Sequence, residues 1–142
     1  MYSNILVTYD GSELSKKSIE VAASFAKENP SLHVEVIYVS NIPYVVVGEG
    51  VFIPTPAQTV DYLASSQAIQ DEVKELVASI PNSTVVVKEG PVVKTILDHA
   101  NAIKSDLIII GSKGHSAIGE FVLGSVSHNV VQHSKIPVLI VK

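Results

Sequence analysis

A stretch of apolar, glycine and small polar residues between positions 106 and 127 has the residue types of a phosphate-binding loop. Residues 107–110 are all apolar, Gly111 follows them, and Gly124-Ser125 precedes a helical pattern. A strand, a glycine-containing loop and the first turn of a helix, in that order, can present backbone N–H groups to a phosphate. Spacing alone does not separate such a site from an ordinary glycine-containing turn, so both interpretations stand at this point.

The residues after the apolar run could hold an anion in two ways. Gly111 and Gly114 can adopt a positive φ, and they present no Cβ to a ligand that approaches the backbone closely. Polar side chains surround these glycines in the sequence and would add hydrogen-bond donors: Ser112, Lys113, His115 and Ser116. Lys113 could screen phosphate charge or simply be a solvated loop lysine.

The helix expected after Gly124 would supply further donors. Its first N–H groups, those of Ser125, Val126 and Ser127, would point at a bound oxyanion because they have no partner inside the helix. The helix dipole would add about 0.3 to 1 kcal/mol. We also expect the hydroxyls of Ser125 and Ser127 to supplement these amides.

Other sequence signals of nucleotide chemistry, catalysis and metal binding are absent. There is no Gly-x4-Gly-Lys-Ser/Thr motif and no Gly-x-Gly-x2-Gly motif after the first strand. Ser125 is not in a Gly-x-Ser-x-Gly elbow, and no nucleophile–base pair is evident, so we expect no efficient catalyst. The histidines lack the spacing of a metal site, and only one of them lies in the glycine loop: His33, His99, His115, His128 and His133.

The elements that must position this loop alternate along the chain. Short Val, Ile and Leu runs predict five strands, near residues 5–9, 32–39, 84–88, 107–110 and 136–141. Helical patterns lie between them, and the second helix, capped by Thr55, is expected to run to about Ile80. Its inward-facing residues are expected to be Val60, Leu63, Ala64, Val73, Leu76 and Val77. Residues 40–55 are expected to form a loop over one edge. Continuous apolar strands with crossover helices predict a doubly wound, mostly parallel α/β sheet.

Ligands bind such a sheet outside the carboxyl ends of its strands. Asp10 follows the first strand, Val39 ends the second and Gly111 ends the fourth, so these positions are expected to lie near one another. Asp10 could contact a ribose hydroxyl, position a metal through water, or cap the turn into the first helix.

Length and composition predict one packed domain, residues 1–142. Hydrophobic residues make up 46% of the chain and charged residues 17%, while the net charge of −4 does not favour nucleic-acid binding. There is no cysteine, no signal-peptide pattern and no apolar run long enough for a membrane span. We therefore expect a cytoplasmic protein that contacts neither nucleic acid nor membrane.

Three sequence features together resemble the universal stress protein family. They are Asp10-Gly11-Ser12, the long motif Gly111-x2-Gly114-x9-Gly124-Ser125, and the closing run Ile136-Pro137-Val138-Leu139-Ile140-Val141. The resemblance covers the whole chain and implies an open five-stranded sheet in the order 3-2-1-4-5. Relatives that keep the complete glycine motif tend to bind ATP, so the resemblance also implies ATP, with Mg²⁺ accompanying the triphosphate.

The resemblance assigns roles to individual positions. Thr8, Asp10 and Val39 would line the adenine and ribose end, although Thr8 stands where relatives often carry proline or alanine. Residues from Gly111 to Ala117 would surround the ribose and phosphates, and Gly124, Ser125, Val126 and Ser127 would hold the phosphate chain. The final strand, Ile136 to Val141, would pair with its symmetry mate in a homodimer.

The function implied is a nucleotide-dependent sensor or regulator in a stress response. Two alternatives stay open from the sequence. One is a weak ATPase or phosphoryl-transfer enzyme that uses the same pocket. The other is a partner protein that binds AMP or a cyclic nucleotide.

Overall fold

The structure is a computed structural model that describes residues 1–41, 45–47, 49–52, 55–114 and 122–142. Its main element is a five-stranded sheet with the order β5-β2-β1-β6-β7, in which each neighbouring pair is parallel. The strands of this sheet are β1 (Asn4–Tyr9), β2 (His33–Ser40), β5 (Ser83–Glu89), β6 (Leu107–Gly111) and β7 (Val138–Val141). Counted within this sheet, the order is 3-2-1-4-5, so the predicted α/β fold is confirmed.

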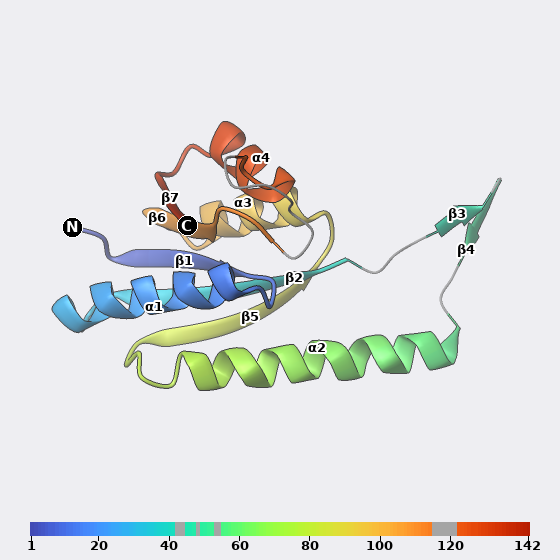
Figure 1. The fold of residues 1–142 in the computed structure, drawn as a ribbon, viewed down its shortest axis with the longest axis horizontal. Helices are drawn as coiled ribbons and strands as arrows, with labels where there is room; N and C mark the ends of the chain where they lie inside the picture. The colour runs from blue at the N-terminus through green and yellow to red at the C-terminus, as the bar shows by residue number, and fades with distance from the viewer. Residues whose placement is uncertain (42–44, 48, 53–54, 115–121) are drawn as a thin grey trace.

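Helices cover both faces of the sheet (Figure 1). They are α1 (Glu13–Glu28), α2 (Pro56–Leu76), α3 (Val92–Ala102) and α4 (Ser125–His133). A hydrophobic core lies on each face of the sheet. Residues of β1 contribute to the two cores in alternation, because successive side chains of a strand point to opposite faces. Ile5 and Val7 pack with α1 and α2, whereas Leu6 packs with Ile96 of α3 and Val130 of α4.

The start of α2 follows the sequence prediction, but its end does not. Thr55 accepts a hydrogen bond from the Gln58 N–H at 3.3 Å, and the Gln58 side chain accepts one from the Thr55 N–H at 2.9 Å. Pro56 occupies the first helical position, where its missing N–H costs nothing. The helix ends at Leu76 rather than near Ile80, since the chain turns there and Ile80 becomes buried in the core.

The first half of α2 does not face the core, contrary to the sequence prediction. Val60 is 64% exposed, Leu63 is 58% exposed and Ala64 is also exposed, whereas Val73 near the other end is buried. A helix of 21 residues extends about 31 Å, more than the roughly 23 Å of the seven-residue strand β5. The N-terminal half of α2 therefore reaches past the sheet (Figure 1). No helix in the described ranges is both long enough and apolar enough to cross a bilayer.

The segment predicted as a loop over one edge contains a β-hairpin instead. Strands β3 (Val45–Val47) and β4 (Gly50–Phe52) pair in antiparallel fashion. Consecutive β-branched residues favour extended backbone, which accounts for a strand where glycines and prolines suggested irregular structure. Figure 1 shows the hairpin projecting away from the main sheet, at the opposite end of the molecule from β7.

The last strand begins at Val138, two residues after the predicted start. Pro137 has no N–H to give to the sheet, although its carbonyl accepts a hydrogen bond from the Ile108 N–H at 2.9 Å. β7 pairs with β6 on one side and forms an edge of the sheet.

Candidate functional site

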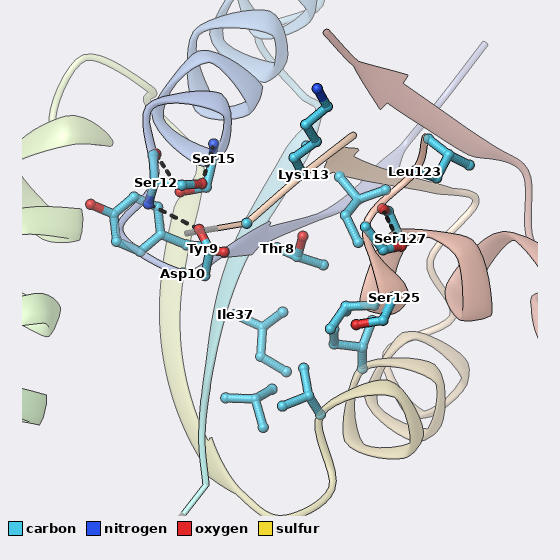
Figure 2. A pocket seen from close by; sticks show the side chains of 18 of the residues that line it. Thr8, Tyr9, Asp10, Ser12, Ser15, Ile37, Lys113, Leu123, Ser125 and Ser127 are labelled. Carbon is cyan, nitrogen blue, oxygen red and sulfur yellow. Dashed lines mark hydrogen bonds between the residues drawn. The ribbon is translucent and has the colours of Figure 1, made fainter. Parts of the chain in front are cut away.

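A pocket of about 510 Å³ opens at the carboxyl ends of β1, β2 and β6, beside the N-terminus of α4 (Figure 2). The order of the strands reverses between β1 and β6, and ligands bind parallel sheets at such a switch point. The predicted site residues that line the pocket are Thr8, Asp10, Val39, Gly111, Lys113, Gly114, Gly124, Ser125, Val126 and Ser127. The predicted positions His115, Ser116 and Ala117 lie outside the described residues.

Asp10 organises the turn that leads from β1 into α1. Gly11 has φ of +85°, a conformation that glycine adopts without strain. The Asp10 carboxylate accepts a hydrogen bond from the Ser12 N–H through Oδ1 at 2.9 Å. This is the capping role considered for Asp10, and it is realised together with a position on the pocket wall.

Gly114 is packed against the other oxygen of the same carboxylate. A Cβ atom at position 114 would lie 2.6 Å from Asp10 Oδ2, closer than real Cβ contacts allow. The absence of a side chain at Gly114 therefore lets the loop after β6 approach the end of β1.

Gly111 lines the pocket but lacks the positive φ that the sequence allowed for it. Neither Gly111 nor Gly114 has a positive φ; the described glycines in that conformation are Gly11 and Gly90. A Cβ at Gly111 would lie 2.9 Å from Cβ of Leu14 and 3.3 Å from its carbonyl carbon. Gly111 thus allows α1 to pack closely on β6.

Ser112 is predicted as a ligand contact, but its backbone serves the fold and the residue does not line this pocket. Its N–H donates to the Val141 carbonyl at 2.8 Å, and its carbonyl accepts from the Gly124 N–H at 2.8 Å. The Ser127 hydroxyl also donates to the Ser112 carbonyl, at 2.9 Å. Ser112 therefore holds the end of β6, the edge strand β7 and the start of α4 together.

The N-terminus of α4 faces the pocket without a side-chain cap. Gly124 occupies the N-cap position and provides no side-chain hydrogen bond, whereas α1 is capped by the Ser12 hydroxyl, which accepts from the Ser15 N–H. The first three N–H groups of a helix have no partner within it. Ser125, Val126 and Ser127, whose N–H groups are predicted to meet an oxyanion, line the pocket.

The hydroxyls at this helix start are not equivalent, contrary to expectation. Ser127 is 3% exposed, and its hydroxyl donates to the carbonyls of Ser112 and Gly124 at 2.9 and 3.0 Å. Its single proton is already used within the fold. Ser125 is exposed, so its hydroxyl is accessible to a ligand.

Lys113 lies at the rim of the pocket. Figure 2 shows its ammonium nitrogen pointing away from Thr8 and Ser125. Lys113 is therefore positioned to act on a ligand through its backbone or through long-range charge, rather than from the pocket floor.

Sequence reasoning missed several residues of the pocket wall: Tyr9, Ser12, Ser15, Ile37, Val92, Ile96, Ile110, Val122 and Leu123. The two-residue repeat of side chains along a strand could have predicted Ile37 and Ile110 as pocket residues. Ile37 precedes the predicted contact Val39 by two residues and so shares its face of β2. The contributions from α3 depend on tertiary packing. Burial raises the pKa of the Tyr9 phenol, and the neighbouring Glu72 carboxylate raises it further, so Tyr9 remains neutral at physiological pH.

Two of the histidines have partners within the fold. The His33 ring contacts Asn4 Oδ1 at 3.0 Å and Thr84 Oγ1 at 2.9 Å. The His99 Nε2 atom of α3 pairs with the Glu35 carboxylate of β2, and both side chains are largely buried. Within the described ranges, no cluster of three His, Cys, Asp or Glu residues could hold a metal.

These features define a doubly wound α/β protein with a pocket at its topological switch point, beside a helix N-terminus that has no side-chain cap. A model of the universal stress protein family matches residues 1–142, and the chain belongs to that family. It is 34% identical over 150 residues to universal stress protein YxiE of Bacillus subtilis, with 100% of each chain covered.

Two similar solved structures are complexes with a nucleotide. A universal stress protein in complex with cAMP is 25% identical, with a TM-score of 0.69 over 99% of this chain and 96% of that one. A universal stress protein from Archaeoglobus fulgidus in complex with dAMP is 18% identical, with a TM-score of 0.67 over 99% of this chain and 98% of that one.

Proposed function

We propose that this chain binds ATP in the pocket between β1, β2 and α4 and acts as a nucleotide-dependent sensor or regulator in a stress response. The observation that carries the proposal is the uncapped N-terminus of α4 facing a pocket at the switch point of the sheet. A volume of about 510 Å³ lies in the usual range for small-molecule sites. The two relatives with cAMP and dAMP support an adenine nucleotide as the ligand class.

The pocket residues divide between the two ends of such a ligand. The N–H groups of Ser125, Val126 and Ser127, with the Ser125 hydroxyl, would bind phosphate oxygens. Asp10 would accept a hydrogen bond from a ribose hydroxyl. Val39 and Ile37 provide apolar surface for the base.

Magnesium would enter with the triphosphate rather than occupy a site of its own. Mg²⁺ is commonly held by substrate phosphates together with one or two carboxylates and water. Asp10 is the carboxylate on the pocket wall that could reach such an ion through water.

The identity of the nucleotide is the first point to measure. Mass spectrometry of material that co-purifies with the protein, followed by calorimetry with ATP, AMP and cAMP, would rank the ligands. We expect ATP with Mg²⁺ to bind most tightly. A folded protein that binds none of the three would contradict the proposed function, and a preference for AMP or cAMP would favour the alternative that the two relatives' ligands suggest.

Turnover separates a binding protein from a weak ATPase. We expect less than one ADP per protomer over the time of a binding measurement, because the pocket shows no activated nucleophile–base pair among the described residues. Multiple turnovers that disappear on changing Asp10→Ala or Ser125→Ala would assign the chain to the enzyme class instead.

We further propose that the chain acts in the cytoplasm as a homodimer. The strand β7, at the edge of the sheet, would pair with its symmetry mate through residues 136–141.

A further inference from the structure

Glu35 and His99 form a buried polar pair on the face of the sheet that α3 covers. The Nε2–H of His99 donates to the Glu35 carboxylate, and each side chain is 11% exposed. Their neighbours are apolar: Leu6 lies opposite Glu35 in the sheet, Ala100 follows His99 in the helix, and both are fully buried. A carboxylate in such surroundings needs a hydrogen-bonding partner, and His99 provides one.

The pair lies next to the apolar end of the pocket. On β2, Glu35 is two residues before Ile37, so the two side chains point to the same face of the sheet. On α3, His99 is three residues after Ile96, so the two side chains lie on the same side of the helix. Ile37 and Ile96 line the pocket. Each of these two walls of the pocket therefore continues into one partner of the pair.

The start of α3 has no side-chain cap to fix its position. Pro91 occupies the N-cap and provides no side-chain hydrogen bond. Val92, the first residue of the helix, also lines the pocket. A hydrogen bond is directional, whereas apolar packing is not. The bond from His99 to Glu35 therefore restricts the distance between α3 and β2 more narrowly than the apolar contacts around it.

Stability alone does not account for a polar pair at this place. Apolar residues of similar volume often stabilise a core as well as a buried charged pair, or better. We propose that Glu35 and His99 are positioning residues, which hold α3 against β2 and thereby set the width of the nucleoside end of the pocket. This role rests on the proposed nucleotide binding and adds the contact that shapes the site.

The main test replaces both partners together, Glu35→Leu with His99→Phe, so that no buried polar group loses its partner. The protein should fold, with a thermal midpoint at most about 4 °C below that of the wild type, but the directional contact is gone. We expect calorimetry to show ATP bound roughly four- to fifteenfold less tightly. This is the loss expected when the base gives up buried contact worth about one or two methylene groups.

Glu35→Gln is the matched control, because its amide oxygen still accepts a hydrogen bond from His99. Its ATP affinity should stay within about twofold of the wild type. A purely structural role would leave ATP affinity unchanged in the folded double variant, and this result would overturn the proposal. A loss in Glu35→Gln as large as that in the double variant would also overturn it, since the hydrogen bond is retained there.

A measurement on the wild type decides the matter if the double variant does not fold. ATP is added while the ring signals of His99 and His33 are followed by NMR. His33 is the internal reference, because it lies on the same strand as Glu35 but contacts Asn4 and Thr84. We expect ATP to shift the His99 signals and to leave those of His33 in place. Unchanged His99 signals, or equal shifts at both rings, would overturn the proposal.

Failure of the proposed function is recognised separately, before any variant is made. A folded wild type that binds neither ATP, AMP nor cAMP contradicts nucleotide binding itself. If the wild type prefers AMP or cAMP, the same variants are compared with that nucleotide and the same outcomes apply. A wild type that binds its nucleotide as tightly as the double variant contradicts only the positioning role of Glu35 and His99.

Discussion

Gly114 and Asp10 determine how closely the loop after β6 approaches the end of β1. A Cβ atom added at position 114 would lie only 2.6 Å from Asp10 Oδ2, so any side chain there must displace this carboxylate. Asp10 is itself exposed, so its carboxylate can move when crowded, but it then loses its hydrogen bond from the Ser12 N–H. Crowding at Gly114 should therefore damage the pocket more than the fold.

We predict that Gly114→Val weakens ATP binding by at least about tenfold, or about 1.4 kcal/mol. The new side chain displaces the Asp10 carboxylate and enters space that the ligand needs. The free energy of unfolding should fall by only about 0.5 to 1.5 kcal/mol, the value of the hydrogen bond from the Ser12 N–H that the displaced carboxylate gives up. Calorimetry measures the affinity and urea denaturation measures the stability.

A double-mutant cycle with Asp10→Ala provides the control. If crowding acts through the carboxylate, Gly114→Val should cost less affinity in the Asp10→Ala background than in the wild type. Equal losses in both backgrounds would show that the valine acts on the ligand directly and that the contact with Asp10 is unimportant.

Among the elements, the start of α4 combines a buried, hydrogen-bonded hydroxyl with an exposed one on the pocket wall. Ser127 joins the helix to the end of β6, whereas Ser125 is two residues earlier and exposed. Both serines lie in the first turn of the same helix, so they form a matched pair for testing these roles.

We predict that Ser127→Ala lowers the free energy of unfolding by about 0.5 to 1.5 kcal/mol, because the Ser112 carbonyl loses one of its two donors and keeps the Gly124 N–H. Ser125→Ala should leave stability within about 0.5 kcal/mol of the wild type, as surface substitutions usually do. It should weaken ATP binding by roughly three- to tenfold, the value of one hydrogen bond. Urea denaturation and calorimetry on both variants give the comparison.

The reverse pattern would refute this division. Normal ATP affinity in Ser125→Ala would show that the Ser125 hydroxyl does not contact the ligand. Normal stability in Ser127→Ala would show that the hydrogen bonds of the Ser127 hydroxyl are dispensable.

Across the molecule as a whole, two apolar surfaces lack partners within the described chain. One is the outer edge of β7, where Val138, Leu139 and Ile140 pack on the cores but are only half-buried. The other is the exposed part of α2 around Val60 and Leu63. The hairpin β3–β4 cannot cover β7, because it lies at the other end of the molecule (Figure 1).

We predict that Ile140→Asp gives a monomer in light scattering, because it places a charge in the pairing strand. Val60→Asp is the control, since it places the same charge on the other apolar surface and should leave a dimer. Circular dichroism confirms that each variant is folded, which is necessary because Ile140 also packs against the core beside α3 and α4. A folded Ile140→Asp dimer, or a Val60→Asp monomer, would place the interface elsewhere.

Much of the site's location could be predicted from the sequence. Continuous apolar runs and crossover helices indicated a parallel sheet, and the carboxyl ends of parallel strands lie at one edge. That brought Asp10, Val39 and Gly111 to the same place, as the structure shows. The contributions of α3 were not predictable, because the apolar stripe of a helix does not reveal which residues pack and which face a pocket.

Local periodicity and chain connectivity were enough to predict the order of the elements, the parallel sheet and the edge at which the pocket opens. The role of each residue at that edge depends instead on tertiary packing. Gly111 lets Leu14 of α1 pack closely, and the Ser127 hydroxyl donates to the Ser112 carbonyl. Because these partners are distant in the sequence, local patterns could not reveal either contact.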